Sequence, residues 1–546
     1  MMGAVYAERI RSALKKHSTD SVLVQGGILA MAGLLTKLLG FLYRIPMANM
    51  LGEQGNGIYS VAFSIYNIAL TLSSYSLPAA VSKLISERLG RGERRAAAQV
   101  FRAAMLFALL GGLAAFAVLF FGAGALETFY RRSGLARPLR VLAPTTLVVA
   151  LLGVLRGWFQ GRGNMGPTAV SQILEQVVNV AVSLVAAWQL TRLHAGTADA
   201  ASYGAAGGTL GTLAGAAAAL LFMLLLWNLA KSRRRRALPA PEPMIWRALL
   251  LTCIPMLLSQ TIYQLGATVD DLLFGRAMEA QGMADTAAAA LQGVYNSQYN
   301  QMTTLPVAIT TAMAAALLPG IALLWSQGRR QEAMSKARTV IKLNMALAIP
   351  AAVGLAVLAG PIMDVLFPRL DTYRDLAAAM LEAGSAAVVF YALSTITASV
   401  LQGSGHVHRP AANAAAALIL HTVLMAVLLW RTELGVWALI VGNVTFPLTL
   451  ALLNCHAMGK LLGYRWEAAR TFVLPCLVSV PMGLAAWGVS RGAAALSLPT
   501  SVGLVLAVAV AVGLYLPLLL RLGCFSPAEL RELPMSRLFR RLAGRR

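Results

Sequence analysis

The chain has few charged residues, and this scarcity excludes a soluble globular protein. Only 12% of its 546 residues are charged and 58% are hydrophobic, whereas soluble domains average about 25% charged and about 45–50% apolar residues. Apolar runs of about 20 residues recur along the whole chain, and each is long enough to cross a bilayer as a helix. The sequence therefore predicts a polytopic membrane protein with almost no length left for a soluble domain.

Cysteine is scarce as well, and the common motifs of metal and nucleotide chemistry are missing. The four cysteines, Cys253, Cys455, Cys476 and Cys524, form no close pair, so no disulfide framework or metal site follows from them. No G-x-x-x-x-G-K-[ST] or H-E-x-x-H motif occurs, and the G-x-G-x-x-G pattern at 161–166 follows a predicted membrane helix instead of a strand. We therefore expect a protein that is not an enzyme and holds no metal or cofactor, with a coupling H⁺ or Na⁺ left open.

Acidic residues are about half as common as basic ones, with 22 Asp and Glu against 46 Lys and Arg. The resulting net charge of +24 is also typical of nucleic-acid binding, but its distribution follows a membrane topology. With the N-terminus in the cytoplasm, the basic residues gather on the inner side, above all at "KSRRRR" (231–236) and in the final "SRLFRRLAGRR". The outer segment "RRSGLARPLR" (131–140) departs from this rule. We predict no nucleic-acid partner and two cytoplasmic termini.

Fourteen apolar spans are predicted along the chain. They cover 22–46, 58–88, 96–122, 139–160, 168–190, 203–229, 247–275, 291–325, 339–361, 376–401, 410–430, 434–459, 471–490 and 500–521. The fold class is therefore an all-α integral membrane protein with about fourteen transmembrane helices. No A-x-A cleavage site follows the first apolar run, which indicates a first span and not a removed signal peptide.

The two halves of the chain repeat each other. At an offset of 236 residues, Gly57 matches Gly293, Tyr59 matches Tyr295, Gly92 matches Gly328 and Arg102 matches Arg338. A Gln-Gly pair after the fourth span also matches one after the tenth span, at an offset of 242. Because each repeat holds six spans, the repeats have the same orientation and an axis along the membrane normal relates them. Two lobes that face each other across a cleft are typical of an alternating-access transporter.

The repeat divides the chain into six predicted parts. They are a cytoplasmic arm (1–21), an N-lobe with six spans (22–229), a basic cytoplasmic linker (230–246), a C-lobe with six spans (247–460), two final spans (461–521) and a basic cytoplasmic tail (522–546).

The first span contains two cations, Lys37 and Arg44. Together with Gly33 and Gly40 they follow a spacing that places all four on one helix face. A charge at the bilayer centre costs about 2.5 kcal/mol or more on the insertion scale. Arg44 is close enough to the outer interface to snorkel, whereas Lys37 is too deep to reach either surface easily. We therefore interpret Lys37, and with it Arg44, as functional.

Further polar residues lie in the spans that would line a shared cleft, although polar stripes also join helices in proteins without a cleft. The predicted substrate-binding residues are Lys37, Arg44, Arg156, Glu175, Tyr263, Gln264, Asn296 and Asn300, and the gate candidates are Lys83, Asp270, Asp271 and Arg276. Two alternatives stay open for Arg156 and Glu175, a structural ion pair or a cavity role. Asp270 or Asp271 could meet Arg44 as a breakable gate, and either aspartate or Glu175 could bind a coupling ion.

The sign of the charges indicates the substrate class. Among deep residues the first lobe offers Lys37, Arg44, Lys83 and Arg156 against Glu175 alone. A low-dielectric cavity with surplus positive charge favours a phosphate or carboxylate and penalises an organic cation. Lysine and arginine together suit a diphosphate, the first as a point charge and the second as a fork of donors.

Three segments resemble the N-terminal region of bacterial polysaccharide-exporter-type flippases. They are T-K-x-x-G-F-x-x-R-I at 36–45, L-G-E-x-G-x-G-x-Y at 51–59 and L-P-x-A-x-S-K at 77–83. This family belongs to the multidrug/oligosaccharidyl-lipid/polysaccharide (MOP) superfamily, and the most similar branches are those of stage V sporulation protein B and the MurJ-type lipid II flippases. Span count and repeat extend the likeness over nearly the whole chain.

The resemblance implies export of undecaprenyl-diphosphate-linked sugars by alternating access in a bacterial cytoplasmic membrane. It places the family's cavity cations of the first helix on Lys37 and Arg44. MurJ-type proteins also have a functional Arg and Glu in the eighth helix, where this chain has the neutral stretch "NSQYNQMTTLP". The precursor is therefore lipid II, a spore-cortex unit or another polysaccharide unit, and membrane lipids are the other expected partners of a protein that acts as a monomer.

Two other functions remain open. A cation-coupled multidrug exporter would need exposed acids and aromatic residues in the cleft to hold a cationic drug, and the first lobe lacks them. In an assembly factor that transports nothing, the polar stripes would only pack helices, and neutralising Lys37 would leave function unchanged.

Overall fold

The protein is described by a computed structural model at residues 2–74, 77–230, 243–370, 372–526 and 529–530. In these ranges all regular structure is helical, which confirms the predicted all-α class. Nine of the fourteen predicted spans each fall on one described helix, to within two residues at the ends. The other five each cover two or more helical segments, and residues 75–76 of one of them lie outside the described residues; these five are 58–88, 291–325, 339–361, 376–401 and 471–490. Ten described helices are long and apolar enough to cross a membrane, and the bent pair Arg374–Gly384 and Ala387–Gly403 makes eleven.

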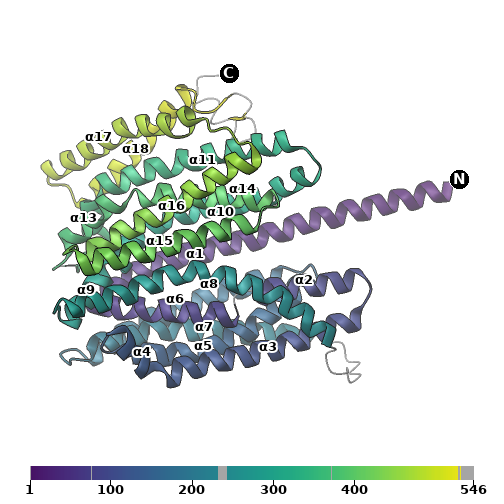
Figure 1. The fold of residues 1–546 in the computed structure, drawn as a ribbon, viewed down its shortest axis with the longest axis horizontal. Helices are drawn as coiled ribbons and strands as arrows, with labels where there is room; N and C mark the ends of the chain where they lie inside the picture. Colours follow the sequence, from purple (N-terminus) through teal and green to yellow (C-terminus); the bar gives the residue numbers. More distant parts are fainter. Residues whose placement is uncertain (1, 75–76, 231–242, 371, 527–528, 531–546) are drawn as a thin grey trace. The chain divides into compact units, whose positions relative to one another are not determined.

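The helices pack into two compact units (Figure 1). Unit 1 contains Met1–Leu51 and Ile58–Thr268, and unit 2 contains Gly52–Gly57 and Val269–Arg546. The boundary between Thr268 and Val269 lies inside one helix, α8 (Pro243–Ala280). Residues 231–242 of the predicted linker and 531–546 of the predicted tail lie outside the described residues.

Unit 1 is built from the first seven helices and the beginning of α8. The seven are α1 (Met2–Ser73), α2 (Leu77–Gly90), α3 (Arg94–Phe121), α4 (Ala123–Tyr130), α5 (Ala136–Gly161), α6 (Gly166–Leu193) and α7 (Ala200–Ala230). α1 includes the first predicted span and most of the second. The two are separated by a bend at Gly52, where φ is 67°. The core of the unit lies among α2, α3, α5, α7 and the start of α8.

Glycines hold α6 and α7 in direct backbone contact. A Cβ added at Gly207 would lie 2.6 Å from the carbonyl oxygen of Ala186, and one at Gly211 would lie 2.5 Å from the backbone nitrogen of Ser183. Small residues let membrane helices approach this closely. Since α6 also carries Gln172, Glu175, Gln176 and Asn179, this contact fixes the position of these polar residues.

Unit 2 contains the remaining helices. They are α9 (Asp285–Gly293), the π-helical turn η1 (Val294–Tyr299), α10 (Asn300–Ser326), α11 (Arg330–Val357), α12 (Ala359–Leu366), α13 (Arg374–Gly384), α14 (Ala387–Gly403), α15 (His408–Arg431), α16 (Val436–Leu462), the π-helical turn η2 (Ala469–Val473), α17 (Leu474–Ala495) and α18 (Thr500–Arg521). α10, α11, α14 and α16 surround its main apolar core, and α17 and α18 lie side by side (Figure 1). The short helices α4, α9 and α12 were not expected as separate elements.

A reciprocal contact joins the bend of α1 to α9 within unit 2. A Cβ added at Gly57 would lie 2.7 Å from the carbonyl carbon of Ala289, and one at Gly293 would lie 2.7 Å from the backbone nitrogen of Gly57 and 3.2 Å from the carbonyl carbon of Glu53. In the sequence repeat, Gly57 corresponds to Gly293 and Glu53 to Ala289. Ala289, which faces Gly57, is thus the repeat partner of Glu53, which faces Gly293, and the contact is reciprocal.

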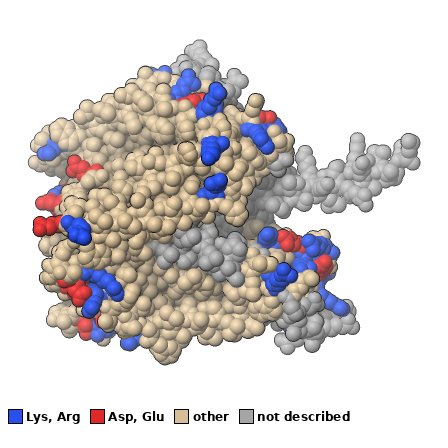
Figure 2. Space-filling model, in the orientation of Figure 1, with Lys and Arg blue, Asp and Glu red and all other residues tan. Residues whose placement is uncertain are grey.

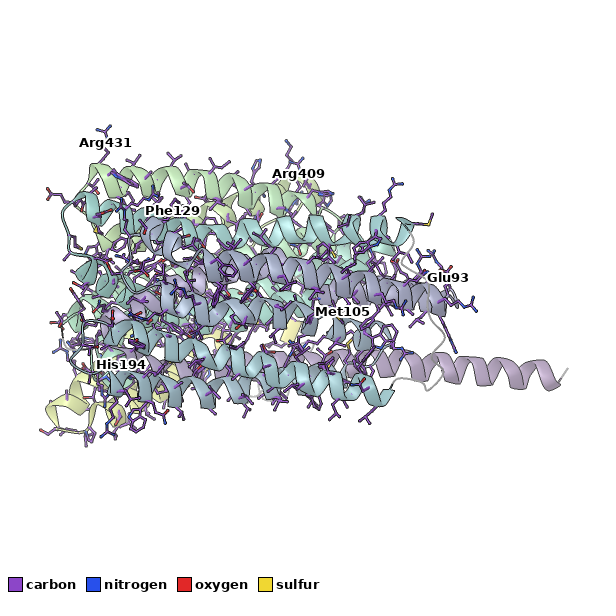
Figure 3. The ribbon with its side chains drawn as sticks, turned by 90° about the horizontal axis from the view of Figure 1, so that it is seen from below. Glu93, Met105, Phe129, His194, Arg409 and Arg431 are labelled. Atoms are coloured by element: carbon purple, nitrogen blue, oxygen red, sulfur yellow. The ribbon has the colours of Figure 1, made fainter. Side chains whose placement is uncertain are left out.

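The surface has the character of a membrane protein. On the face shown in Figure 2, charged side chains gather toward the ends of the helices and leave a broad uncharged band between them. Figure 3 shows Arg409 and Arg431 at the two ends of α15, and Glu93 and His194 at opposite ends of unit 1. Large apolar side chains on the outside of the helices, such as Phe121 and Leu221, are exposed. These features define a multi-pass membrane protein.

Candidate functional site

The two cations of α1 have exposed side chains although they lie within a membrane span. Lys37 and Arg44 are both exposed, and their separation of seven residues places them on the same face of the helix. Among the described residues Lys37 forms no ion pair. Arg44 lies beside the hydroxyls of Tyr43 and Tyr59, which are themselves 3.5 Å apart. α1 thus presents two positive charges on a face that ligand or lipid can reach.

Arg156 and Glu175 form an ion pair inside unit 1. Arg156 of α5 donates to Glu175 of α6 at 2.7 Å and to the Ser171 hydroxyl at 2.9 Å. The side chains of the pair are only 12% and 29% exposed. The acid is therefore already neutralised by an arginine, so it does not offset the charge of Lys37. The geometry is that of the predicted structural pair, and a role of either residue in binding substrate stays a prediction.

Next to this pair, two glutamines of α6 have polar atoms with no hydrogen-bond partner. Gln172 Oε1 and Gln176 Nε2 are buried and make no hydrogen bond in the structure. α1 passes close to them, because a Cβ added at Gly40 would lie 3.4 Å from Gln176 Nε2. Leaving a buried polar atom without a partner costs about 1–3 kcal/mol. These amides sit within a turn of Glu175 and beside the helix of Lys37, where they can bind a polar group that enters.

Four other predicted residues can be placed on helices, but the structure assigns them no role. Lys83 on α2 and Arg276 near the end of α8 are exposed, and their assignment as gate residues stays a prediction. Tyr263 and Gln264 lie on α8, but their side chains are outside the described residues.

In unit 2, Asp270 of α8 is held by a histidine of α15. His421 Nε2 lies 2.7 Å from Asp270 Oδ1, and the two side chains are 3% and 13% exposed. Gly442 of α16 provides the space, since a Cβ there would lie 2.9 Å from His421 Cε1. The ring of Phe446 meets the imidazole edge to face, with centroids 5.4 Å apart.

The neighbouring Asp271 belongs to a separate network of amides and phenols. Its Oδ1 accepts hydrogen bonds from Gln292 at 2.5 Å and from Asn296 at 3.3 Å. The network continues from Asn296 to Asn300, then to Asn443 of α16, and from there to the hydroxyls of Tyr295 and Tyr299. Thus Asn296 and Asn300, both predicted as substrate ligands, bind protein groups here. A contact of Arg44 with Asp270 or Asp271 would join the two units and stays a prediction.

The sequence analysis missed His421, although a signal was present. His421 is an ionisable residue well inside a predicted span, and such residues are functional candidates by default. Asn443 and Gln292 carried no comparable signal, because neutral amides are ordinary contacts between membrane helices.

A buried lysine, Lys342 of α11, was also missed. Its side chain is 1% exposed and contacts Glu467 at 2.8 Å and Glu529 at 2.6 Å. Burial alone would raise the pKa of the Glu529 carboxyl, but hydrogen bonds from Lys342 and Ser526 hold that pKa below its usual range. Because Glu529 follows the last helix, this contact ties the end of the described chain to α11.

Fold and charge distribution together define a class, the helical multi-pass membrane proteins with a transporter fold. Two solved structures share it. One is lipid II flippase MurJ in an inward closed conformation, with a TM-score of 0.67 and 13% identity over 90% of this chain and 97% of that one. The other is an inward-facing multidrug resistance MATE family transporter of the MOP superfamily, with a TM-score of 0.65 and 17% identity over 81% and 98%.

Sequence comparison gives the family. The profile of the polysaccharide biosynthesis protein family matches residues 22–325, and the MatE profile matches residues 255–427. Stage V sporulation protein B of Bacillus subtilis is 28% identical over 80% of this chain and 83% of its own length. Lipid II flippase MurJ of the same organism is 25% identical over 70% and 73%. The chain belongs to the polysaccharide biosynthesis protein family, within the MOP superfamily of flippases and transporters.

Proposed function

We propose that the protein is a flippase that moves an undecaprenyl-diphosphate-linked saccharide from the inner to the outer leaflet of a bacterial cytoplasmic membrane. The proposed cargo is a peptidoglycan precursor such as lipid II, or a related cortex or polysaccharide unit. The protein works as a monomer with both termini in the cytoplasm.

One observation carries the proposal. Lys37 is exposed within a membrane span and has no ion pair among the described residues, while Glu175, the acid inside α6, is already paired with Arg156. A positive charge that no protein group neutralises in a low-dielectric region attracts an anionic ligand. Arg44 on the same face supplies a planar fork of donors, and such a fork suits phosphate oxygens.

The chemistry of the cargo fits these groups. Lys37 and Arg44 would bind the diphosphate, and the unpartnered amides of Gln172 and Gln176 would bind polar atoms of the head group. The polyprenyl tail would stay in the lipid while the head group crosses by alternating access. An inside-negative membrane potential favours outward movement of negative charge by about 2.3 kcal/mol per charge per 100 mV.

Transport in proteoliposomes tests the proposal. The probe is a short-chain polyprenyl-diphosphate sugar with a fluorescent label, and a membrane-impermeant quencher reports the fraction in the outer leaflet. We compare wild type with the double variant Lys37→Gln and Arg44→Gln. A matched control, Arg431→Gln with Lys460→Gln, removes two exposed cations near ends of α15 and α16.

We expect the wild type and the control to move the probe at the same rate. The Lys37 and Arg44 double variant should be slower by at least about 100-fold, because each charge-assisted hydrogen bond contributes about 1.5–3 kcal/mol. A double variant as fast as wild type would disprove the assigned role of the cations. Absence of movement in wild type would disprove the function.

The competing function is cation-coupled multidrug export. The MatE profile on residues 255–427 and the MATE neighbour favour it, as does the buried acid Asp270 in unit 2. Its cargo would be an organic cation, which the positive face of α1 repels. Efflux of a cationic dye from the same proteoliposomes, without movement of the diphosphate probe, would establish this alternative instead.

A further inference from the structure

We propose that Asp270 and His421 form a proton-binding site that couples the flippase to the transmembrane pH gradient. The inference rests on the proposed function for its role in transport, but the site itself can be tested without transport. It extends the assignment of Asp270 from a gate candidate to one half of a carboxylate–imidazole pair.

The pair lies deep in the membrane part of unit 2. His421 is thirteen residues from the beginning of α15 at His408 and ten from its end at Arg431. At 1.5 Å per residue these separations are about 20 Å and about 15 Å along the helix. Ionisable residues at such depth face the interior of the protein and mark proton or ion pathways.

Charge balance in this setting favours one bound proton. A carboxylate with a neutral imidazole has a net charge of −1, and a net charge buried in a low-dielectric region is strongly unfavourable. One added proton makes the pair neutral, as a carboxylate with an imidazolium or as a carboxylic acid with an imidazole. Histidine is the side chain whose charge changes most readily near neutral pH.

An unpartnered ring nitrogen provides the place where a proton can bind or leave. His421 Nε2 contacts Asp270 at 2.7 Å, while His421 Nδ1 is buried and makes no hydrogen bond in the structure. The whole residue is 4% exposed. A histidine with only a structural role normally satisfies both ring nitrogens when it is buried.

Among the side chains that the structure describes around the pair, none supplies a compensating cation. The titratable side chains that act on Asp270 electrostatically are His421 of α15, Tyr295 of η1 and Tyr391 of α14. The adjacent Asp271 is held by Gln292 and Asn296. A proton is therefore the positive charge that can neutralise Asp270 in this conformation.

The donor set is unsuited to a metal ion. Within the described residues no group of three or more His, Cys, Asp and Glu side chains could hold one. Asp270 Oδ1 is already occupied by the imidazole, and hard cations such as Ca²⁺ and Mg²⁺ need several oxygen ligands at once. The pair fits a proton, which needs only the two groups present.

The role in transport follows from occlusion. In the described conformation the pair is shielded from water and is stable when protonated. Release of the proton requires a conformation in which water reaches the pair, so the proton can leave on one side after it has entered on the other. Inward proton flow would then favour the return step that follows outward delivery of the lipid.

Proteoliposomes with separately imposed gradients test the coupling. The membrane potential is clamped at zero with valinomycin and equal potassium, and a gradient of one pH unit or a tenfold sodium gradient is applied. The variants are Asp270→Asn and His421→Gln, and His456→Gln on α16, an exposed histidine, is the control. The probe is the fluorescent diphosphate lipid.

With one proton coupled to each lipid, the pH gradient should change the steady-state ratio of lipid between leaflets by up to tenfold in wild type and control. The two variants of the pair should show no such change. Retention of the pH effect in Asp270→Asn would overturn the proposal. A sodium effect that this variant abolishes would also overturn it in favour of a sodium site.

A measurement without transport separates failure of this inference from failure of the proposed function. Purified wild type and Asp270→Asn are titrated potentiometrically in detergent from acidic to alkaline pH. We expect the wild type to bind one more proton than the variant near neutral pH. Equal proton counts would overturn the site even if wild type moves the lipid, and a difference of one proton would support it even if the cargo is different.

Discussion

Unit 1 and unit 2 contain repeats of one another, yet they place their ionisable groups differently. Unit 1 exposes Lys37 and Arg44 on one face of α1. Unit 2 instead buries Asp270 against His421, and it buries Lys342 between two glutamates. Unit 1 therefore exposes cations on a membrane helix, whereas unit 2 buries its ionisable groups in contact with one another.

The repeat shows which features the two halves share. The pairs that match at an offset of 236 include Gly57 with Gly293 and Tyr59 with Tyr295, and all four residues are packing residues. At the same offset Lys37 corresponds to Leu273, Asp270 to Leu34 and Asp271 to Leu35. Packing residues are thus common to both halves, and so is the arginine pair Arg102 and Arg338, while Lys37, Asp270 and Asp271 are each found in one half only. The two halves thus share a fold but differ in the ionisable residues of their membrane helices.

The largest effect is expected from reversing the charge that unit 1 presents. Lys37→Glu replaces a cation on the exposed face of α1 by a carboxylate. The diphosphate is then repelled at the position where the lysine would attract it. We expect transport of the diphosphate probe to fall by more than about 100-fold. Thermal unfolding in detergent should change little, because the side chain is exposed.

The control for this reversal is Lys460→Glu, which changes the same net charge at an exposed position near the end of α16. Transport by Lys460→Glu should equal that of wild type. If both reversals slow transport equally, the effect comes from net charge and the comparison between the units fails.

The second effect tests the packing that the repeats share. Gly57→Val and Gly293→Val each place a side chain where a Cβ alone would lie 2.7 Å from backbone atoms of the facing segment. Overpacking of this kind costs about 1–3 kcal/mol, and here backbone must move, so we expect about 3 kcal/mol. Thermal unfolding measures the loss, with Gly488→Val as the control because a Cβ at Gly488 meets no atom within 4 Å.

The double variant sharpens this test. Since both glycines act on one reciprocal contact, the two losses should be less than additive once either substitution has separated the segments. Full additivity of the two losses in stability would mean that Gly57 and Gly293 make independent contacts and not one reciprocal contact.

A third effect concerns the ion pair that neutralises the acid of unit 1. Arg156→Gln leaves Glu175 without its cation, and we expect a loss of about 1–2 kcal/mol in stability, below the value for fully buried pairs because Glu175 is 29% exposed. Thermal unfolding measures this loss.

The opposite change, Glu175→Gln, leaves the positive charge of Arg156 without its partner beside α1, so we expect tighter binding of an inorganic diphosphate. Equilibrium binding measures the affinity, and weaker binding than in wild type would contradict this expectation.

The sequence allowed the fold to be predicted well, for physical reasons. Apolar runs of membrane length identify helices directly, and nine of the fourteen predicted spans each fall on one described helix. The short helices α4 and α12 escaped notice because a segment of eight residues, as each has, carries no membrane signal of its own. The segment Gly52–Gly57 of α1 belongs to unit 2 and packs on α9, a tertiary contact that no local pattern of residues contains.

The candidate site was only partly predictable. Lys37 and Arg44 could be found because charge in an apolar run is conspicuous. The pair of Arg156 and Glu175 could be found because the two opposite charges lie in consecutive predicted spans. His421 and Asp270 lie 151 residues apart in the chain, so their contact depends on how α8 and α15 pack. Pairing across distant helices is information that a single sequence does not carry.

The smallest effect is a pH dependence at the buried lysine of unit 2. The pKa of Glu529 is lowered in the folded protein by Lys342 and Ser526, against the opposing effect of burial. A carboxyl with a lowered pKa contributes stability that is fully present above its unfolded value, about 4.3, and is lost as the pH falls through the lowered value. The contact of Glu529 with α11 should therefore weaken only in acid.

Hydrogen exchange at Glu529 and Leu530, corrected for intrinsic rates, tests this expectation and should accelerate below about pH 4 in wild type. Glu529→Gln should exchange fast at every pH because its ionic contact is already lost. Exchange in wild type that stays slow in acid would show that apolar packing of the buried Leu530, and not the lysine, holds this segment.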